Sequence, residues 1–249
     1  MKISNLLSLA SLLIVSASAI AAELNVMSAG AVEPGVHAVA LAYEKDTSSH
    51  VRLKFGTGPQ LKEYLSFGQS FDILIAPNAL IEEQVTQSKL LLGEIGYVGK
   101  VGAGVVVRKG SSAPSIYSLD DLKQVVLAAD RVVYNKASTG IYLDKLFVKM
   151  GIGDAVARKA VRYADGESVL MHIAKGSGYE IGFGAITEIK LLEEKGLQYI
   201  GPLPAEVQNY TSYLAGVRVD SPHAVEARKF LKEIATFRTN GNFQKLGLE

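Results

Sequence analysis

The chain has 249 residues with 26 basic and 25 acidic side chains, so its formal net charge is +1 at neutral pH. A balanced chain of this kind lacks the basic surface that nucleic acids or anionic lipids require. Cysteine is absent, which excludes disulfides and thiolate catalysis, and the four histidines do not show the spacing of metal ligands. The sequence therefore predicts no metal site and no cofactor.

The N-terminus is typical of a secretory signal peptide. Lys2 supplies a positive start, residues 6–14 form a short apolar run, and Ala19-Ile20-Ala21 fits the A-x-A cleavage pattern. The alternative is a membrane anchor, which needs roughly 20 apolar residues, more than this segment provides. Residues 1–21 are predicted to be cleaved, which places the mature chain in the periplasm without membrane insertion.

The first part of the mature chain alternates strands with helices. Three strands are predicted, at residues 24–27, 51–55 and 71–75. The middle strand alternates polar and apolar side chains, as a half-buried strand does. Three helices follow the strands in turn, at residues 35–45, 60–67 and 79–87. This βαβαβα order indicates a parallel sheet covered by helices.

Two long extended segments interrupt this pattern. Residues 99–107 form a run of glycine and valine that is too glycine-rich for a helix, and residues 210–219 are again extended. Between them a helix is predicted over residues 115–129, with Ser118 as its N-cap. Further strands are predicted at residues 131–134, 161–163, 180–183 and 197–200, with helices at 140–150, 167–175 and 187–195. A final helix is predicted from Ser221 to about Phe237, with Pro222 at its first helical position.

The two extended segments are interpreted as crossings between two lobes. The predicted fold class is α/β, with two βα lobes joined by two extended crossings. Residues 22–100 together with 216–249 form the first lobe, and residues 101–215 form the second lobe with the hinge crossings. The alternative is a single doubly wound sheet. Two crossings form a hinge, and a hinge between α/β lobes forms a ligand cleft.

Four strand-to-helix turns are expected to face that cleft, because ligands of open α/β sheets bind beyond the carboxyl ends of the strands. The turns are rich in glycine and small polar side chains, and they span residues 28–34, 56–60, 136–140 and 164–168. Their backbone N–H groups and the helix dipoles favour an anion. The alternative is that their serines and threonines only cap the helices. Taken together, the four turns predict an anion site between the lobes.

The segments 24–31, 55–65, 72–76 and 138–142 make the chain resemble the molybdate-binding-protein-like family of periplasmic solute-binding proteins. The resemblance covers essentially the whole mature chain and is specific for the superfamily but not for the ligand. It implies the type II periplasmic-binding-protein fold and a chain that acts as a monomer. It also implies a possible partner, an ABC permease to which a bound anion would be delivered.

The resemblance places the ligand contacts of true molybdate binders on this chain. In chain order the contacts fall on Ala31, in the turn at residues 57–59, near Thr139, near Glu167-Ser168 and on Ala185. Alanine thus replaces one serine and the tyrosine that donate hydrogen bonds to molybdate. Each lost charge-assisted hydrogen bond costs about 1.5–3 kcal/mol. The expected ligand is therefore a larger organic anion, such as a polycarboxylate, rather than a tetrahedral oxyanion.

In these departures the chain resembles an enzymatic branch of the family, the aconitate isomerases. This resemblance implies an allylic proton shift that interconverts trans- and cis-aconitate. One group removes a proton from a CH₂ beside a carboxylate, and one group returns a proton at the other end of the double bond. Two hypotheses stay open: an isomerase of a polycarboxylate such as aconitate, and a substrate-binding protein of a molybdate-type ABC transporter.

The candidate proton carriers are side chains on the cleft turns and the second crossing. The predicted catalytic residues are Glu167, Glu33 and Tyr213; the alternative is that the carboxylates only stabilise helix starts and that the tyrosine packs in the core. The candidate clamps for a substrate carboxylate are Lys62, Lys136 and Arg162, and the alternative for Lys62 is a solvated surface role. His172 is expected to be structural. The predicted substrate-binding residues are Ser28, Ala31, Thr57, Gly58, Gln60, Ser138, Thr139, Ser168 and Tyr210.

Overall fold

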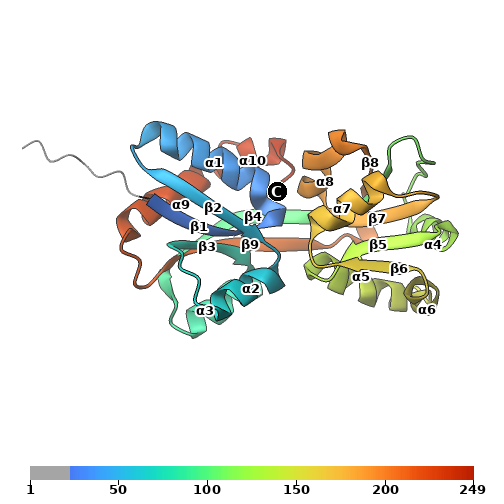
Figure 1. Ribbon diagram of the computed structural model, residues 1–249, viewed down its shortest axis with the longest axis horizontal. Helices are drawn as coiled ribbons and strands as arrows, with labels where there is room; N and C mark the ends of the chain where they lie inside the picture. Colours follow the sequence, from blue (N-terminus) through green and yellow to red (C-terminus); the bar gives the residue numbers. More distant parts are fainter. Residues whose placement is uncertain (1–22) are drawn as a thin grey trace, which may run out of the picture.

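A computed structural model describes residues 23–249 (Figure 1), so the predicted signal peptide lies outside the described residues. The described chain forms two α/β lobes side by side, joined by two long strands, which confirms the predicted fold class. Among the helices of this part of the chain, none is long and apolar enough to cross a membrane.

The first lobe, on the left of Figure 1, is built on three parallel strands. β1 (Glu23–Ala29) pairs in parallel with both β2 (His50–Gly56) and β3 (Ile73–Pro77). The segments that follow these strands are a 3-10 turn (Gly30–Val32), α1 (Glu33–Asp46), α2 (Gly58–Ser66) and α3 (Asn78–Thr86). Because the strands are parallel, the starts of α1 and α2 lie at the same edge of the sheet.

The second lobe repeats this arrangement. β5 (Arg131–Asn135) pairs in parallel with β6 (Ala160–Tyr163) and β7 (Glu180–Ala185). The second-lobe helices are α4 (Leu119–Ala128), α5 (Ser138–Lys149), α6 (Gly153–Ala157), α7 (Gly166–Lys175) and α8 (Ile186–Leu192). Ser118 caps α4, as the sequence predicts. Short 3-10 turns (Glu193–Lys195 and Ala205–Val207) flank β8 (Leu197–Pro202).

Two strands run between the lobes. β4 (Leu90–Arg108) and β9 (Tyr210–Arg218) pair antiparallel with each other, and β4 continues into the second lobe to pair with β7 and β8. The nine strands of residues 23–249 thus form one continuous mixed array. β4 begins well before the predicted residue 99, and β9 also pairs with β3, so much of β9 extends the first sheet. The division of the lobes at residues 100 and 216 stays a proposal.

The end of the chain returns to the first lobe as α9 (Ala224–Thr239) and α10 (Asn242–Lys245). The predicted helix start at Ser221, with Pro222 at the first helical position, is wrong. The hydroxyl of Ser221 donates to buried Asp72 at 2.6 Å and accepts the N–H of His223 at 3.1 Å. These bonds hold residues 221–223 as a turn that precedes the helix.

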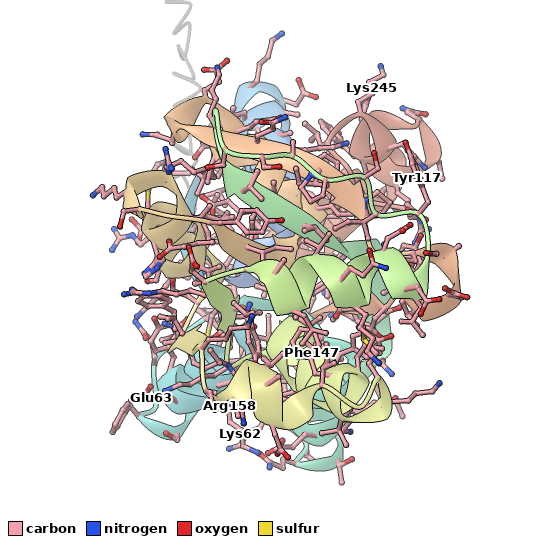
Figure 2. The ribbon with its side chains drawn as sticks, turned by 90° about the vertical axis from the view of Figure 1, so that its right-hand side faces the viewer. Lys62, Glu63, Tyr117, Phe147, Arg158 and Lys245 are labelled. Atoms are coloured by element: carbon pink, nitrogen blue, oxygen red, sulfur yellow. The ribbon has the colours of Figure 1, made fainter. Side chains whose placement is uncertain are left out.

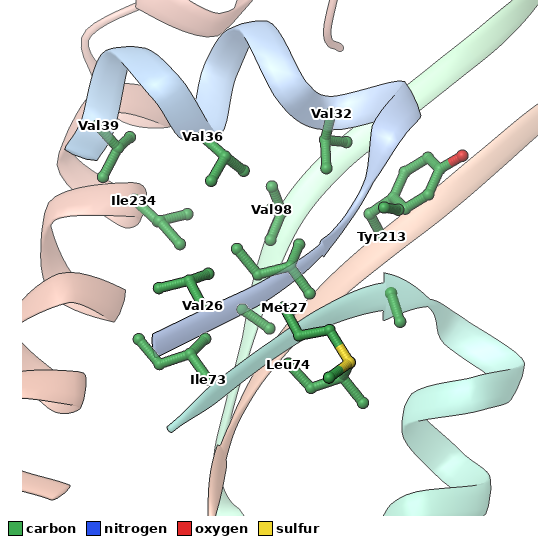
Figure 3. Close-up of a cluster of buried hydrophobic side chains, with 14 of the residues drawn as sticks. Val26, Met27, Val32, Val36, Val39, Ile73, Leu74, Val98, Tyr213 and Ile234 are labelled. Atoms are coloured by element: carbon green, nitrogen blue, oxygen red, sulfur yellow. The ribbon is translucent and has the colours of Figure 1, made fainter. Parts of the chain in front are cut away.

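The core of the first lobe forms where the start of α1 covers β1 (Figure 3). Val32, Val36 and Val39 recur every three or four residues, which places them on one helix face, and all three are fully buried. They pack toward Val26 of β1. Tyr213 of β9 lies at the end of this cluster and is 4% exposed, with its hydroxyl directed away from the cluster.

The core of the second lobe is centred on an aromatic group. Phe147 packs edge-on against Tyr134 and Phe183, with ring centroids 5.8 and 5.9 Å apart. Figure 2 views the molecule from the end of this lobe and labels buried Phe147 and exposed Arg158. Each lobe therefore has its own core, and the helix starts between the lobes are left to form a site.

Candidate functional site

A small cavity lies between the lobes, where the strand-to-helix turns of both lobes meet. Its lining residues are Ala29, Gly30, Ala31, Gly56, Thr57, Gly58, Pro77, Asn135, Ala137, Ser138, Thr139, Ala185, Glu188 and Tyr213. The cavity volume is about 30 Å³, close to the volume of one water molecule. The lobes are thus closed on each other, and a ligand of several atoms enters only when they separate.

A direct hydrogen bond between the lobes borders this cavity. The hydroxyl of Thr187, at the start of α8, donates to the backbone oxygen of Ala31 in the first lobe. Thr187 is 1% exposed, so water does not compete for this bond. The bond contributes to the closed arrangement of the lobes.

The start of α5 offers free backbone donors to the cavity. Its N-cap is Ala137, which has no side chain that can cap the helix. The side-chain oxygen of Asn135 accepts the N–H groups of Ala137 and Gly140 at 3.0 and 3.1 Å. The first amides of a helix have no acceptor within it, so the N–H groups of Ser138 and Thr139 remain for an anion.

At the start of α2, side chains of the turn itself cap the helix. Thr57 and Gln60 form a capping box: the N–H of Thr57 donates to the Gln60 side chain at 2.8 Å, and the Thr57 hydroxyl donates to the same oxygen at 3.0 Å. Gln60 is therefore engaged in capping, and Thr57 contributes to the cavity wall while it caps the helix. Capping and ligand binding share this turn.

Arg162 organises the α5 turn from outside the cavity. Its guanidinium donates to the backbone oxygen of Asn135 at 3.0 and 3.2 Å and to Asp144 at 2.9 and 3.1 Å. It also lies 4.2 Å from the centroid of the Tyr134 ring. With its donors engaged in this way, Arg162 positions the turn and does not serve as the predicted carboxylate clamp.

Glu188 is a titratable side chain in the cavity wall that sequence analysis does not identify. It lies in the first turn of α8 and is partly buried. A Cβ atom added at Gly30 would lie 3.2 Å from Oε1 of Glu188, and one added at Gly166 would lie 2.1 Å from Oε2. The carboxyl group therefore occupies the space left by two glycines, one from each lobe.

The surroundings of Glu188 favour its protonated form. Burial is the main cause that raises its pKa to about 7, the negative charges of Asp165, Glu33 and Glu167 contribute to the increase, and a hydrogen bond from the backbone N–H of Ala185 opposes it. Tyr213 lines the same cavity, and burial together with the charge of Glu188 raises its pKa. The cavity thus contains a carboxyl group that can give or take a proton near neutral pH and a phenol that stays protonated.

The three predicted catalytic residues are placed differently. Tyr213 lines the cavity. Glu167 is exposed at the start of α7, and Glu33 is half-buried at the start of α1, 3.7 Å from His37. Burial raises the pKa of Glu33, His37 opposes this, and the charge of Glu167 adds to it. The two carboxylates therefore interact across the lobes outside the cavity wall, and their catalytic roles remain untested predictions.

Five of the predicted substrate-binding residues line the cavity, namely Ala31, Thr57, Gly58, Ser138 and Thr139. Ser28 instead lies buried within β1, and its hydroxyl bonds to the backbone oxygen of Ala29. Ser168 borders a different hollow beside His172. Tyr210 is 41% exposed at the end of β9, with the Lys100 ammonium 4.1 Å from its ring centroid.

His172 belongs to a polar group on the outer face of the second lobe. Its Nδ1 lies 2.7 Å from the hydroxyl of Tyr163, and its Nε2 lies 3.2 Å from the carboxylate of buried Glu180. Such contacts fit the structural role predicted for it. Within residues 23–249, no cluster of three or more histidine or acidic side chains could hold a metal ion.

Residues 24–249 match a family described as bacterial extracellular solute-binding proteins, and the chain belongs to this family. A curated protein of Pseudomonas sp named aconitate isomerase is 27% identical over 242 residues, covering 92% of this chain and 90% of the relative. The predicted resemblance to this branch is therefore confirmed.

Solved structures show the same fold at low identity. The periplasmic molybdate-binding protein of Azotobacter vinelandii superposes with a TM-score of 0.74 at 14% identity, over 91% of this chain and 98% of that one. The sulfate-binding protein SubI of Mycobacterium tuberculosis superposes with a TM-score of 0.73 at 16% identity, over 91% and 86%. Peb3 of Campylobacter jejuni superposes with a TM-score of 0.66 at 15% identity, over 90% of this chain and 98% of that one. The two-lobed fold of molybdate-binding-type proteins is thus confirmed.

Proposed function

We propose that the protein is a periplasmic isomerase that binds an unsaturated polycarboxylate such as aconitate between its lobes and shifts the double bond. The observation that carries this proposal is the composition of the cavity, where free helix amides lie together with a carboxyl group and a phenol. Backbone N–H groups bind the carboxylates of the substrate. The carboxyl group and the phenol serve the allylic proton shift, which needs no cofactor in this scheme.

The similarity to the Pseudomonas protein supports the same activity, because it extends over nearly the whole of both chains. The periplasmic location rests on the predicted signal peptide at residues 1–21 and on the family. A single chain supplies both halves of the cavity, so a monomer suffices for the reaction.

The cavity disfavours a small tetrahedral oxyanion. Glu188 would place a like charge beside it, while Ala31 and Ala185 offer no side-chain hydrogen bond. We expect calorimetry to show no tight binding of molybdate, tungstate or sulfate, and measurable binding of a di- or tricarboxylate. Submicromolar affinity for molybdate would contradict this selectivity.

Binding of a polycarboxylate requires the lobes to separate and close again around it. A ligand can bias such a hinge only if it contacts both lobes. Thr57 in the first lobe and Thr139 in the second are the expected contacts. Because the lobes must open to admit a ligand, we propose that the protein without ligand exchanges between the closed form and open forms. Small-angle scattering should then show a smaller radius of gyration with bound tricarboxylate than without it, and equal radii at saturation would contradict hinge closure.

The decisive experiment incubates the purified mature protein with trans-aconitate and follows the isomers by chromatography. Formation of cis-aconitate that depends on the protein, and its reversal from cis-aconitate, would support the isomerase. A substrate-binding protein of an ABC transporter is the second candidate, because the molybdate-binding protein of Azotobacter vinelandii and the sulfate-binding protein SubI share the fold of this chain. Tight binding of a carboxylate without any turnover would favour that candidate.

A further inference from the structure

We infer that Glu188 is the residue that takes up and returns the substrate proton, and that Tyr213 donates a hydrogen bond to the substrate carboxylate on which negative charge develops. This inference rests on the proposed isomerase activity. It assigns the reaction to α8 and β9, whereas the sequence directs attention to Glu167 at the start of α7.

The position of the Glu188 carboxyl group is restricted on both sides. A Cβ at Gly166 would clash with the carboxyl group, and a Cβ at Gly30 would make a tight contact of 3.2 Å with its Oε1. Its neighbour Thr187 anchors the start of α8 to the first lobe through Ala31. The carboxyl group is therefore held at the junction of the lobes, where a substrate that contacts both lobes must pass it.

The titratable groups that act on Glu188 lie on α7, α1 and β9. Asp165 and Glu167 lie at the start of α7, Glu33 lies at the start of α1, and Tyr213 lies on β9. The three carboxylates all favour the protonated form of Glu188, and a polyanionic substrate adds to this effect. A carboxyl group with a pKa of about 7 serves both as a base and as an acid at neutral pH.

The reaction is then balanced without an oxidant or a reductant. The carboxylate of Glu188 removes a proton from the substrate CH₂, and the electron pair of that C–H bond moves into the allylic system and onto the adjacent carboxylate. Tyr213 stabilises this charge with its O–H group and keeps its own proton. The carboxylic acid of Glu188 then protonates the far carbon of the allylic unit, which shifts the double bond and restores the carboxylate.

The test compares Glu188→Gln with a matched surface variant, Glu194→Gln, whose exposed side chain lies just beyond the end of α8. Loss of a general acid–base group typically lowers the rate 10²–10⁴-fold. We expect Glu188→Gln to lower kcat for trans-aconitate at least about 10²-fold, while calorimetry shows unchanged or tighter binding because a like charge is removed. We expect Glu194→Gln to behave as the unmodified protein.

Two further readouts separate a chemical role from a structural one. In the unmodified protein kcat/KM should rise with pH through about 7, as the base ionises, and the residual activity of Glu188→Gln should lack this limb. Glu188→Asp, which keeps a carboxyl group, should retain more activity than Glu188→Gln. Tyr213→Phe should lower kcat at least about tenfold with little change in KM.

The outcomes distinguish the inference from the function on which it rests. Absence of turnover in the unmodified protein would overturn both. Turnover in the unmodified protein that Glu188→Gln leaves unchanged would overturn only the inference. A larger loss in Glu167→Gln than in Glu188→Gln would also overturn it and return the role to Glu167. If Glu188→Gln fails to fold, then Glu188→Asp and Tyr213→Phe decide: wild-type kcat and an unchanged pH profile in both would overturn the inference.

Discussion

The starts of α7 and α8 each carry a glutamate in the first turn, but the two carboxylates are placed differently. In α7 the side chain of Asp165 caps the helix by accepting the N–H of Ser168 at 2.7 Å, and Glu167 at the second helical position remains exposed. In α8 the cap is Ala185, which has no polar side chain, and Glu188 at the third position turns back to the N–H of Ala185.

This comparison shows how the position of a first-turn carboxylate determines its direction. Glu167, at the second helical position, points to solvent. Glu188, at the third helical position, reaches back to the N–H of the cap residue, as the carboxylate of a capping box does. In this protein that direction leads into the cavity. Four predictions test the difference between the two helix starts.

The largest effect is expected from Gly166→Ala. The new Cβ would lie 2.1 Å from Oε2 of Glu188, so the carboxyl group must move out of its place. We expect turnover to fall about 10²-fold, while the unfolding midpoint stays the same or rises because alanine favours a helix. Gly93→Ala, at an exposed site with free space, is the control for kinetic and thermal measurements. Full activity in Gly166→Ala would show that the carboxyl position does not matter.

The second effect concerns stability against pH. The pKa of Glu188 is raised in the folded protein to about 7 from 4.5, so folding is increasingly penalised as pH rises between these values. Glu188→Gln removes this penalty. It should stabilise the protein at pH 8 by up to about 3 kcal/mol and have little effect at pH 4, as measured by urea unfolding. The control Glu167→Gln, at an exposed position, should change the free energy of unfolding by less than about 0.5 kcal/mol at both pH values. If Glu188→Gln increases the free energy of unfolding by the same amount at pH 4 and pH 8, this result would contradict the raised pKa of Glu188.

A smaller effect is expected from Thr187→Val, which keeps the side-chain shape but removes the hydroxyl. The backbone oxygen of Ala31 loses the hydrogen bond that it accepts from buried Thr187, which costs about 1 kcal/mol. Because the bond joins the lobes, the radius of gyration without ligand should also increase in small-angle scattering. An unchanged unfolding midpoint and radius would show that other contacts hold α8 against the first lobe.

The smallest effect is expected from Asp165→Asn. Asparagine caps a helix as well as aspartate does, so the stability of α7 should be retained. One of the negative charges that raise the pKa of Glu188 is removed, so the midpoint of the pH–rate profile should move to lower pH, by less than about one unit. An upward shift of the midpoint would contradict this electrostatic account. Asp165→Ala, which also removes the cap, should in contrast lose about 1 kcal/mol of stability.

Much of the cavity wall could be predicted because turns after parallel strands always gather at one edge of a sheet. Thr57, Ser138 and Thr139 follow their strands directly, so their approximate place depends only on the order of elements. Ser28 was expected at the site from the same reasoning, but the period of β1 turns its side chain into the core. Arg162 is close in the sequence to the turn at residues 164–168, but its guanidinium donates hydrogen bonds to Asp144 and to the backbone oxygen of Asn135.

The role of Glu188 was missed because the sequence predicts a helix that starts at residue 187, one residue after the actual start of α8. A helix that begins at residue 187 makes Glu188 its second residue, like Glu167, whereas α8 begins at Ile186. The difference decides whether the carboxylate can reach back to the cap. The signal that could have revealed it is the alanine at position 185 followed three residues later by a glutamate.

The alternation of strands and helices, the two long crossings and the absence of thiol chemistry follow from the amino-acid sequence alone, because periodicity and composition act locally. Which carboxylate enters the cavity depends on how the two lobes pack together. Gly30 and Gly166 come from different lobes and are far apart in the chain, and the space that they leave for Glu188 exists only when the lobes are packed together. The pKa of that carboxyl group depends on the same packing, because its burial and its three acidic neighbours come from separate helices.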